Sequence, residues 1–334
     1  MPNSPITIKK TDRFFIAIAK IEVHSFVLFG VYNQFKVNNL LSRVGKVFDD
    51  SKIDDTCIDE CMRPFYFLSG GIAAQLMDEG VFRKKRRQAA INYQAYDISY
   101  EQYLEYLTIL SNLSTQKNAF YCYQPNWVSE EQIILKYDKV PRQTSSNENV
   151  AQIKQSVASL NVGNTCRHSA IALVEAVQKE PISTSVSSYF FRDLPYKTIL
   201  EFGQPTNSIP FYVLPAPPSA YIGLGDEKEL ILRDLYAGME RLPHIAPHDQ
   251  ITMDKFSRLK ELYNNIAGPQ KDVSLNELLQ NIQVWKSKNC VVLDTLREKF
   301  WGLDFFFKRT SATMLLVNNV ESRLEKFITS SLTR

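Results

Sequence analysis

The chain has 334 residues, 44% of them apolar and 22% charged, and a formal net charge of +3. This composition is typical of a globular protein of one or two domains, and the charge is too small to indicate nucleic acid as a partner. The sequence has no run of about 18 apolar residues that would span a membrane and no apolar signal core near its N-terminus. An odd number of cysteines, five, favours reduced thiols in a cytoplasmic setting.

The residues from 13 to 48 predict β structure. RFFIAIAKIEV (13–23) and HSFVLFGVY (24–32) are two candidate strands, and VNNLLSRVGKVF (37–48) is a third. Asn33 and Gln34 mark a turn between the second and the third. The second run is apolar on both faces, which is typical of a central strand covered by helices.

The middle of the chain alternates helical and strand-like patterns. Ser99 and Gln102 form a capping-box pattern ahead of a helix expected at about 100–113. The polar residues 141–150 predict a loop, and a helix is expected from 167 to 178. Residues 187–214 return to strand-like composition in the runs SSYFF, YKTILEF and PFYVL.

A proline-rich segment, LPAPPSA (214–220), predicts a domain boundary because proline fixes φ and removes hydrogen-bond donors. Helical patterns follow it. One ends at Gly268-Pro269, one is capped by Ser274 and runs through Trp285, and two more are expected near 290–300 and 311–331. We therefore expect an α+β fold with a sheet domain at 1–220 and an all-helical domain at 221–334.

The stretch NVGNTCRHSA (161–170) places Cys166 at the start of a predicted helix. A helix N-terminus carries partial positive charge and free N–H groups, which favour a thiolate and can stabilise an oxyanion. Asn161 and Asn164 are candidate side-chain donors to that oxyanion. Cys166 is therefore the candidate nucleophile, and such a nucleophile needs a base.

The chain has four histidines that could supply this base. His168 follows Cys166 by two positions, about 200° around a helix, so it cannot face the thiol well. His244 and His248 lie in a proline-bounded loop of the helical half. His24 opens an apolar strand, an unusual position for packing alone. His24 is the favoured base, with His244 or His248 as the alternative.

The segments VHSFVLFGVYNQ, YFLSGG (66–71) and NTCRHSAIALVEAV together resemble the circularly permuted papain-like cysteine hydrolases. That group includes the PPPDE isopeptidases and the lecithin:retinol acyltransferase and NlpC-type relatives. The resemblance implies a papain-like antiparallel sheet packed on the cysteine-bearing helix, with Cys166 as nucleophile and His24 as base. The third polar residue is not fixed, and Asn33 or Gln34 are candidates by position. Two departures are the single residue between Asn164 and Cys166 and the long His–Cys separation.

NVGNTCRHSAIALV is also similar to the cysteine box of ubiquitin-specific proteases, N-x-G-N-T-C-x-x-x-S. This resemblance implies Asn161 as oxyanion donor and Cys166 as nucleophile. The family's Gly-His-Tyr context far downstream is absent here. Both resemblances imply attack of a thiolate on an amide, isopeptide or acyl carbonyl, and a protein substrate of ubiquitin-like type.

Several further features of the sequence point away from cofactors. No glycine-rich phosphate loop is present, so nucleotide binding has no support. Cys57 and Cys61 share one helical face, but no second ligand pair follows them, so no metal is expected. Cys122 and Cys290 are expected in the core. The basic run RKKRR is expected on a solvated surface, with weak contact to an anionic membrane as an alternative for Arg83, Lys84, Lys85, Arg86 and Arg87.

The C-terminal residues ESRLEKFITSSLTR resemble the translocation signals of bacterial type IV secretion effectors. This implies secretion into a host cytosol without a cleaved signal peptide, and a host protein as substrate. The alternative to a thiol hydrolase or acyl transferase is a non-catalytic effector or scaffold. It would bind a host protein or an anionic membrane through the helical domain and the basic run.

Overall fold

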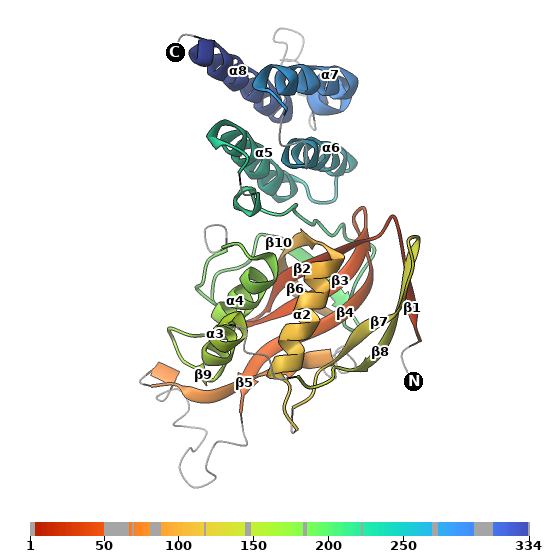
Figure 1. The fold of residues 1–334 in the computed structure, drawn as a ribbon, viewed down its shortest axis with the longest axis vertical. Helices are drawn as coiled ribbons and strands as arrows, with labels where there is room; N and C mark the ends of the chain where they lie inside the picture. The colour runs from red at the N-terminus through yellow and green to blue at the C-terminus, as the bar shows by residue number, and fades with distance from the viewer. Residues whose placement is uncertain are drawn as a thin grey trace. The chain divides into compact units, whose positions relative to one another are not determined.

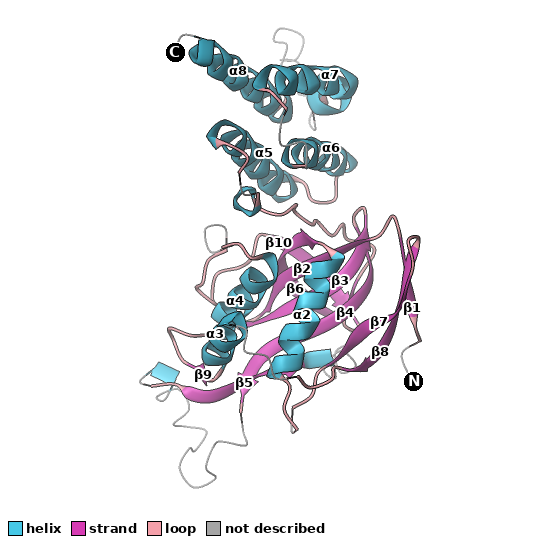
Figure 2. Ribbon diagram, in the orientation of Figure 1, coloured by secondary structure: helices cyan, strands magenta, loops and turns pink. Residues whose placement is uncertain are grey.

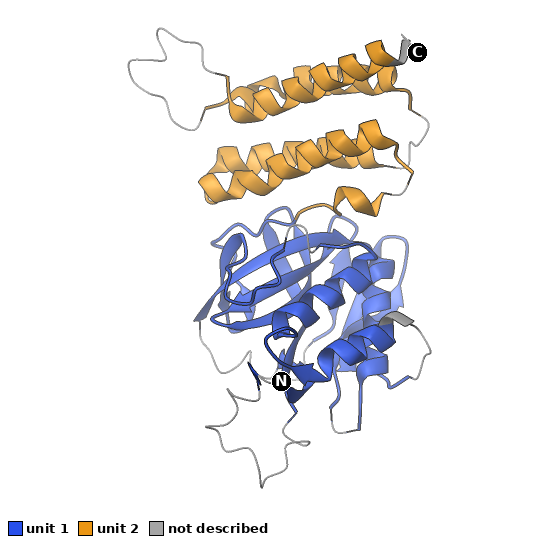
Figure 3. Ribbon diagram, turned by 90° about the vertical axis from the view of Figure 1, so that its left-hand side faces the viewer, with its two compact units in different colours: residues 1–213 blue, residues 214–334 orange. Residues whose placement is uncertain are grey.

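The computed structural model describes residues 4–49, 67–68, 70–80, 88–116, 118–143, 148–182, 186–221, 223–268, 273–296 and 310–332. The chain divides into two compact units, Met1–Val213 and Leu214–Arg334 (Figure 3). The first unit combines strands and helices, and the second is helical (Figure 2). The division falls at the start of the proline-rich segment 214–220, whereas the sequence predicted it at the end of that segment.

An eight-stranded sheet, antiparallel at each pairing, organises the first unit. β2 and β3 are buried along almost their whole length, which explains why both sequences are apolar on both faces. A tight turn at Glu22 and Val23 joins them and pairs Ile21 with His24. The strands follow one another across the sheet in the order β11 (Gln204–Pro205), β10 (Tyr196–Glu201), β6 (Gln88–Ile98), β2 (Arg13–Ile21), β3 (His24–Asn33), β4 (Lys36–Phe48), β5 (Ile72–Asp78) and β9 (Ser159–Leu160).

Three helices cover one face of this sheet (Figure 1): α2 (Tyr100–Leu113), α3 (Glu148–Val157) and α4 (Cys166–Gln178). The capping box predicted for α2 is present, because Ser99 and Gln102 exchange side chain to backbone hydrogen bonds. Tyr103 and Tyr106 of α2 pack their rings on Phe29 of β3. α4 contacts β2, β3 and β4, so the helix that Cys166 begins lies against the centre of the sheet.

On the opposite face of the sheet, the non-helical segment around Phe211 packs on β2 and β6. Phe211 stacks on Tyr93 of β6 with ring centroids 4.2 Å apart and packs against Phe15 of β2 at 5.0 Å. The backbone N–H of Tyr212 donates to the Tyr93 hydroxyl at 2.8 Å. A second, three-stranded sheet orders β1 (Ile6–Lys9), β8 (Gln132–Lys139) and β7 (Tyr121–Val128).

In the described residues of the second unit there are four long helices and one short 3₁₀ turn, Pro218–Ala220. The Ser274 hydroxyl accepts the Glu277 N–H at 3.3 Å, which confirms the predicted helix start there. Within the described residues, no helix is both long enough and apolar enough to cross a bilayer. The helices are α5 (Asp226–Ile245), α6 (Gln250–Ala267), α7 (Leu275–Asp294) and α8 (Ala312–Leu332).

The mixed fold with a C-terminal helical region is confirmed, but several details of the prediction are wrong. A separate helix near 290–300 does not exist in the described part, because α7 continues from Leu275 to Asp294. Cys290 is exposed on α7 rather than in the core, whereas Cys122 is buried as expected. The run SSYFF (187–191) forms turns instead of a strand. Hydrogen bonds from Arg167 and Lys20 to its backbone hold it in that form.

Candidate active site

The candidate nucleophile begins a helix, as the sequence predicts. α4 starts at Cys166, and Thr165 precedes it in extended conformation as the N-cap. The His168 ring turns back to this cap, and its Nδ1 accepts the Thr165 N–H at 3.2 Å. His168 is therefore a capping residue and does not serve as the base. The free N–H groups of the first turn remain beside the sulfur.

The tip of the β2–β3 hairpin meets the Cys166 sulfur. The backbone N–H of Ser25 donates to Sγ at 3.1 Å, and the carbonyl oxygen of Val23 lies 3.7 Å from it. The His24 side chain lies near the same thiol, close enough to lower its pKa. Two residues far apart in the sequence thus form the pair that the sequence favoured as base and nucleophile.

A third residue completes the arrangement, and it was not predicted from the sequence. Glu79, directly after β5, accepts a short hydrogen bond from His24 Nε2 through Oε1. Its other oxygen, Oε2, accepts from Arg43 Nε at 3.0 Å, and the Arg43 guanidinium lies 3.9 Å above the Phe26 ring. Glu79 is only 4% exposed, so its carboxylate is fixed between two cationic partners.

Gly45 permits the contact between His24 and Glu79. The strand β4 lies between β3 and β5, so Glu79 must reach across β4 to touch His24. A Cβ at position 45 would lie 1.9 Å from Glu79 Oε1 and 2.9 Å from His24 Nε2. Both distances are far inside van der Waals contact, so only glycine leaves space for the pair.

The electrostatics favour an ion pair between Cys166 and His24. Burial raises the pKa of Cys166, but hydrogen bonds from His24 and the Ser25 N–H and the charges of His24 and Arg167 lower it below the ordinary value. Burial lowers the pKa of His24, but hydrogen bonds to Cys166 and Glu79 and the Glu79 charge raise it to about 9. Burial also raises the pKa of Glu79, and its contacts with His24 and Arg43 lower it. These shifts together favour the thiolate, the imidazolium and the carboxylate.

Two buried cations support the loop and helix around Cys166. Lys46 donates to the carbonyl oxygens of Ser156 at 2.8 Å and Asn164 at 2.9 Å. Burial lowers the pKa of Lys46 to about 8, against an opposing contribution from Cys166. Arg167 is fully buried, and its Nε donates to the Ser25 hydroxyl at 2.9 Å. Both cations fix the backbone that carries the nucleophile.

The two asparagines predicted as oxyanion donors have other contacts. The Asn164 amide donates to the carbonyl oxygens of Ser156 at 2.7 Å and Ser159 at 3.1 Å, so it shapes the loop before α4. The Asn161 amide nitrogen lies 3.1 Å from where a Cβ on Gly71 would be, and the Asn161 backbone bridges to Asn164. The role of Asn161 stays a prediction.

Asn33 and Gln34, the candidates for the third residue, lie away from Cys166. Asn33 ends β3 at the opposite end from His24, and its amide donates to Asp12 Oδ1 at 3.3 Å. Gln34 adopts a positive φ of 53° in the turn that follows. Neither is the third residue, because a ten-residue strand separates them from His24. His244 and His248 belong to the helical unit.

Some predicted features fall outside the described residues: the basic run 83–87, and Cys57 and Cys61. Among the residues that the structure describes, no cluster of three or more His, Cys, Asp or Glu side chains could hold a metal ion.

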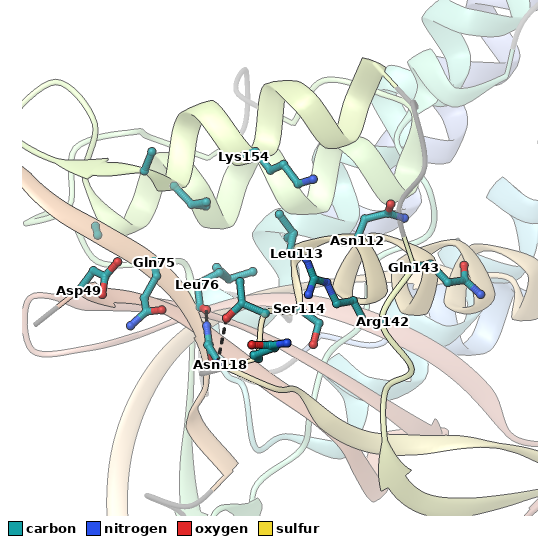
Figure 4. Close-up of a pocket in the computed structure, with 15 residues that line it drawn as sticks. Asp49, Gln75, Leu76, Asn112, Leu113, Ser114, Asn118, Arg142, Gln143 and Lys154 are labelled. Carbon is teal, nitrogen blue, oxygen red and sulfur yellow. Dashed lines mark hydrogen bonds between the residues drawn. The ribbon is translucent and has the colours of Figure 1, made fainter. Parts of the chain in front are cut away.

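The same unit also contains a hollow of about 700 Å³ between β5, α2 and α3 (Figure 4). Asp49, Arg142 and Lys154 line it with several amides, and the Asn118 amide donates to the Leu76 carbonyl oxygen at 2.5 Å. Its lining contains neither a cysteine nor a histidine. The reactive groups lie at the Cys166 cluster instead.

Comparisons with known proteins find no family model, no curated protein and no solved structure that matches this chain. The resemblances to permuted papain-like hydrolases and to ubiquitin-specific proteases therefore stay predictions. What the chain can do follows from the geometry of its own residues, Cys166, His24, Glu79 and Arg43, and from the backbone around them.

Proposed function

We propose that the first unit is a thiol hydrolase or acyl transferase that acts on an amide, isopeptide or acyl bond through a thioester. The observation that carries the proposal is the connected series Cys166–His24–Glu79–Arg43, built over a glycine. A nucleophile, a base and a group that orients the base are the parts that covalent acyl transfer needs.

In the first half-reaction the Cys166 thiolate attacks the carbonyl carbon and a C–S bond forms. The negative charge on the substrate oxygen is stabilised by the free N–H groups of the first turn of α4, including that of Cys166 itself. His24 then gives its proton to the leaving amine or alkoxide as the C–N or C–O bond breaks. A thioester and a neutral imidazole remain.

In the second half-reaction His24 takes a proton from water, or from an acceptor amine, as that nucleophile attacks the thioester. The C–S bond breaks and the thiolate and imidazolium are restored. Because Glu79 binds Nε2, the other ring nitrogen, Nδ1, is the one left to exchange protons at the sulfur. Glu79 orients the ring and stabilises its charged form.

The resemblances imply a protein substrate, and a ubiquitin-like conjugate of a host cell is part of the proposal. The competing proposal is a non-catalytic binding protein. It requires no reactive thiol, so the reactivity of Cys166 distinguishes the two.

The decisive experiment is the pH dependence of Cys166 alkylation by iodoacetamide, followed by peptide mass spectrometry. The exposed thiol of Cys290 serves as an internal reference in the same sample. We expect Cys166 to react with an apparent pKa well below the ordinary value of about 8.5, and His24→Ala to raise it toward that value. An inert Cys166 would overturn the proposal in favour of a binding protein, and a reactive Cys166 that His24→Ala leaves unchanged would overturn the pairing with His24.

A further inference from the structure

The segment 187–193, between α4 and β10, is attached to the candidate active site by buried cations. Arg167, the residue after Cys166, donates to the carbonyl oxygens of Ser187 at 3.2 Å and Arg192 at 3.1 Å. Lys20, which is also buried, donates to the carbonyl oxygen of Phe191 at 3.1 Å and to Asp193 at 2.7 Å. A surface loop is usually mobile, and here two buried charges hold it in one conformation.

The same contacts lead directly to the nucleophile. Arg167 Nε binds the Ser25 hydroxyl, and the Ser25 N–H binds the Cys166 sulfur. Lys20 pairs with Ser25 in the β2–β3 ladder. Ser25 therefore links Arg167 and Lys20, the two residues that anchor the segment 187–193, to the Cys166 sulfur. The anchored segment forms a wall next to the site.

This wall presents apolar side chains to solvent. Tyr189 is 59% exposed and Phe191 62%, and their rings stack at 5.5 Å between centroids. Val23, whose carbonyl oxygen lies beside the sulfur, is 64% exposed at the hairpin tip. Scattered exposed apolar residues need no explanation, but here a stacked aromatic pair lies on a segment anchored beside the nucleophile, and an exposed valine lies on the hairpin tip that contacts the sulfur.

We infer that Tyr189, Phe191 and Val23 form the substrate-recognition surface of this site and bind a bulky apolar side chain of an extended polypeptide near the bond that is attacked. The inference rests on the proposed function and names its substrate class. Burial of the exposed rings by one side chain supplies binding free energy at the reacting centre.

A polypeptide fits this surface better than a lipid chain. Exposed charged residues interrupt the patch: Arg192 and Asp193 on the wall, and Glu22 at the hairpin tip. The Arg192 guanidinium lies 5.7 Å from the Tyr189 ring centroid. An interrupted apolar patch accommodates a single side chain, and the charged groups beside it suit the polar backbone of a peptide.

The test uses chloromethyl ketones, which alkylate a reactive thiol with loss of chloride. The probes are acetyl-Phe-Gly, acetyl-Gly-Phe and acetyl-Gly-Gly chloromethyl ketone, and N-hexyl iodoacetamide compared with iodoacetamide. We expect one phenylalanine probe to label Cys166 about tenfold faster than the Gly-Gly probe. The double variant Tyr189→Ala/Phe191→Ala should abolish that preference, so that the ratio of the phenylalanine-probe rate to the Gly-Gly-probe rate falls to about one. Trp127→Ala, an exposed aromatic on β7, is the matched control and should keep the preference.

The outcomes separate this inference from the proposed function. A Cys166 that no probe labels overturns the proposed function itself. Rapid reaction with iodoacetamide, but no preference for phenylalanine or a preference that survives the double variant, overturns the recognition surface alone. A gain for the hexyl probe that exceeds the gain for phenylalanine overturns the polypeptide assignment.

Discussion

Cys122 and Cys166 are both buried in the first unit, but their surroundings differ. Cys122 lies on β7 near Tyr103, among core aromatic residues. Cys166 lies at a helix start, where His24 and Arg167 both lower the pKa of its thiol. Burial alone disfavours a thiolate, so the environment of Cys166 has to supply compensating charge. Charge and geometry, rather than exposure, therefore mark the candidate nucleophile.

Cys290 extends the comparison to a third environment. It is exposed on α7, so reagents reach it freely, and its alkylation rate is the reference for a thiol in solvent. Changes that break the site should make Cys166 less reactive than Cys290, because Cys166 would keep its burial and lose its charge stabilisation.

The largest effect is expected from Gly45→Ala. Its Cβ would displace Glu79 or His24, and the thiol pKa would return toward its ordinary value. At pH 6 we expect the alkylation rate of Cys166, relative to Cys290, to fall about a hundredfold. Gly70→Ala is the matched control, since its Cβ would meet no atom within 4 Å. A Gly45→Ala protein that is folded by circular dichroism and reacts normally would contradict the assignment of Glu79.

Glu79→Gln should have a smaller effect. The amide can still bond to the imidazole, but it no longer attracts the positive charge, so the pKa of His24 falls and that of Cys166 rises. We expect about a tenfold lower alkylation rate at pH 6. Glu105→Gln, which removes a surface partner of Lys179, should leave the rate unchanged. Equal alkylation rates for the two variants would contradict the role of Glu79 in this site.

The smallest effect concerns stability and pH. The pKa of His24 is raised from 6.5 to about 9 by folding, so its stabilising contribution is complete below pH 6.5 and is lost as pH rises through about 9. His24 is 31% exposed, so solvent screening limits the contribution to about 1 kcal/mol. Urea unfolding of Cys166→Ser and Cys166→Ser/His24→Asn should show the part of that difference that is due to Glu79 at about pH 6, and the difference should be lost as the pH rises. The Ser background removes the titration of the thiol, and Lys46 titrates in both proteins. A difference independent of pH would contradict the charged state of His24.

His24 and Cys166 could be predicted from the sequence because each has a local signal. Cys166 follows small polar residues and precedes a helical pattern, and His24 opens a strand that is apolar on both faces. The helix starts at Ser274 and after Ser99 were predictable for the same reason, since capping is a local interaction.

Glu79 could not be predicted because its role depends on contacts across an intervening strand. The segment MDEG around it resembles any strand end. Gly45 was the available signal, since an isolated glycine within a strand indicates close approach of another group. The turns at 187–191 were missed because the aromatic run has strand-like composition, and the contacts from Arg167 and Lys20 that shape it are long-range.

The chain order of the site has a consequence for protein synthesis. His24, Gly45, Glu79 and Cys166 come from four separate segments, and Cys166 is the last of them to be made. Until α4 docks on β3 and β4, the thiol has no imidazolium partner and keeps its ordinary, mostly protonated state. A nascent or misfolded chain would therefore carry a cysteine no more reactive than a thiol in solvent, and the enhanced reactivity of Cys166 would arise only when this unit has folded.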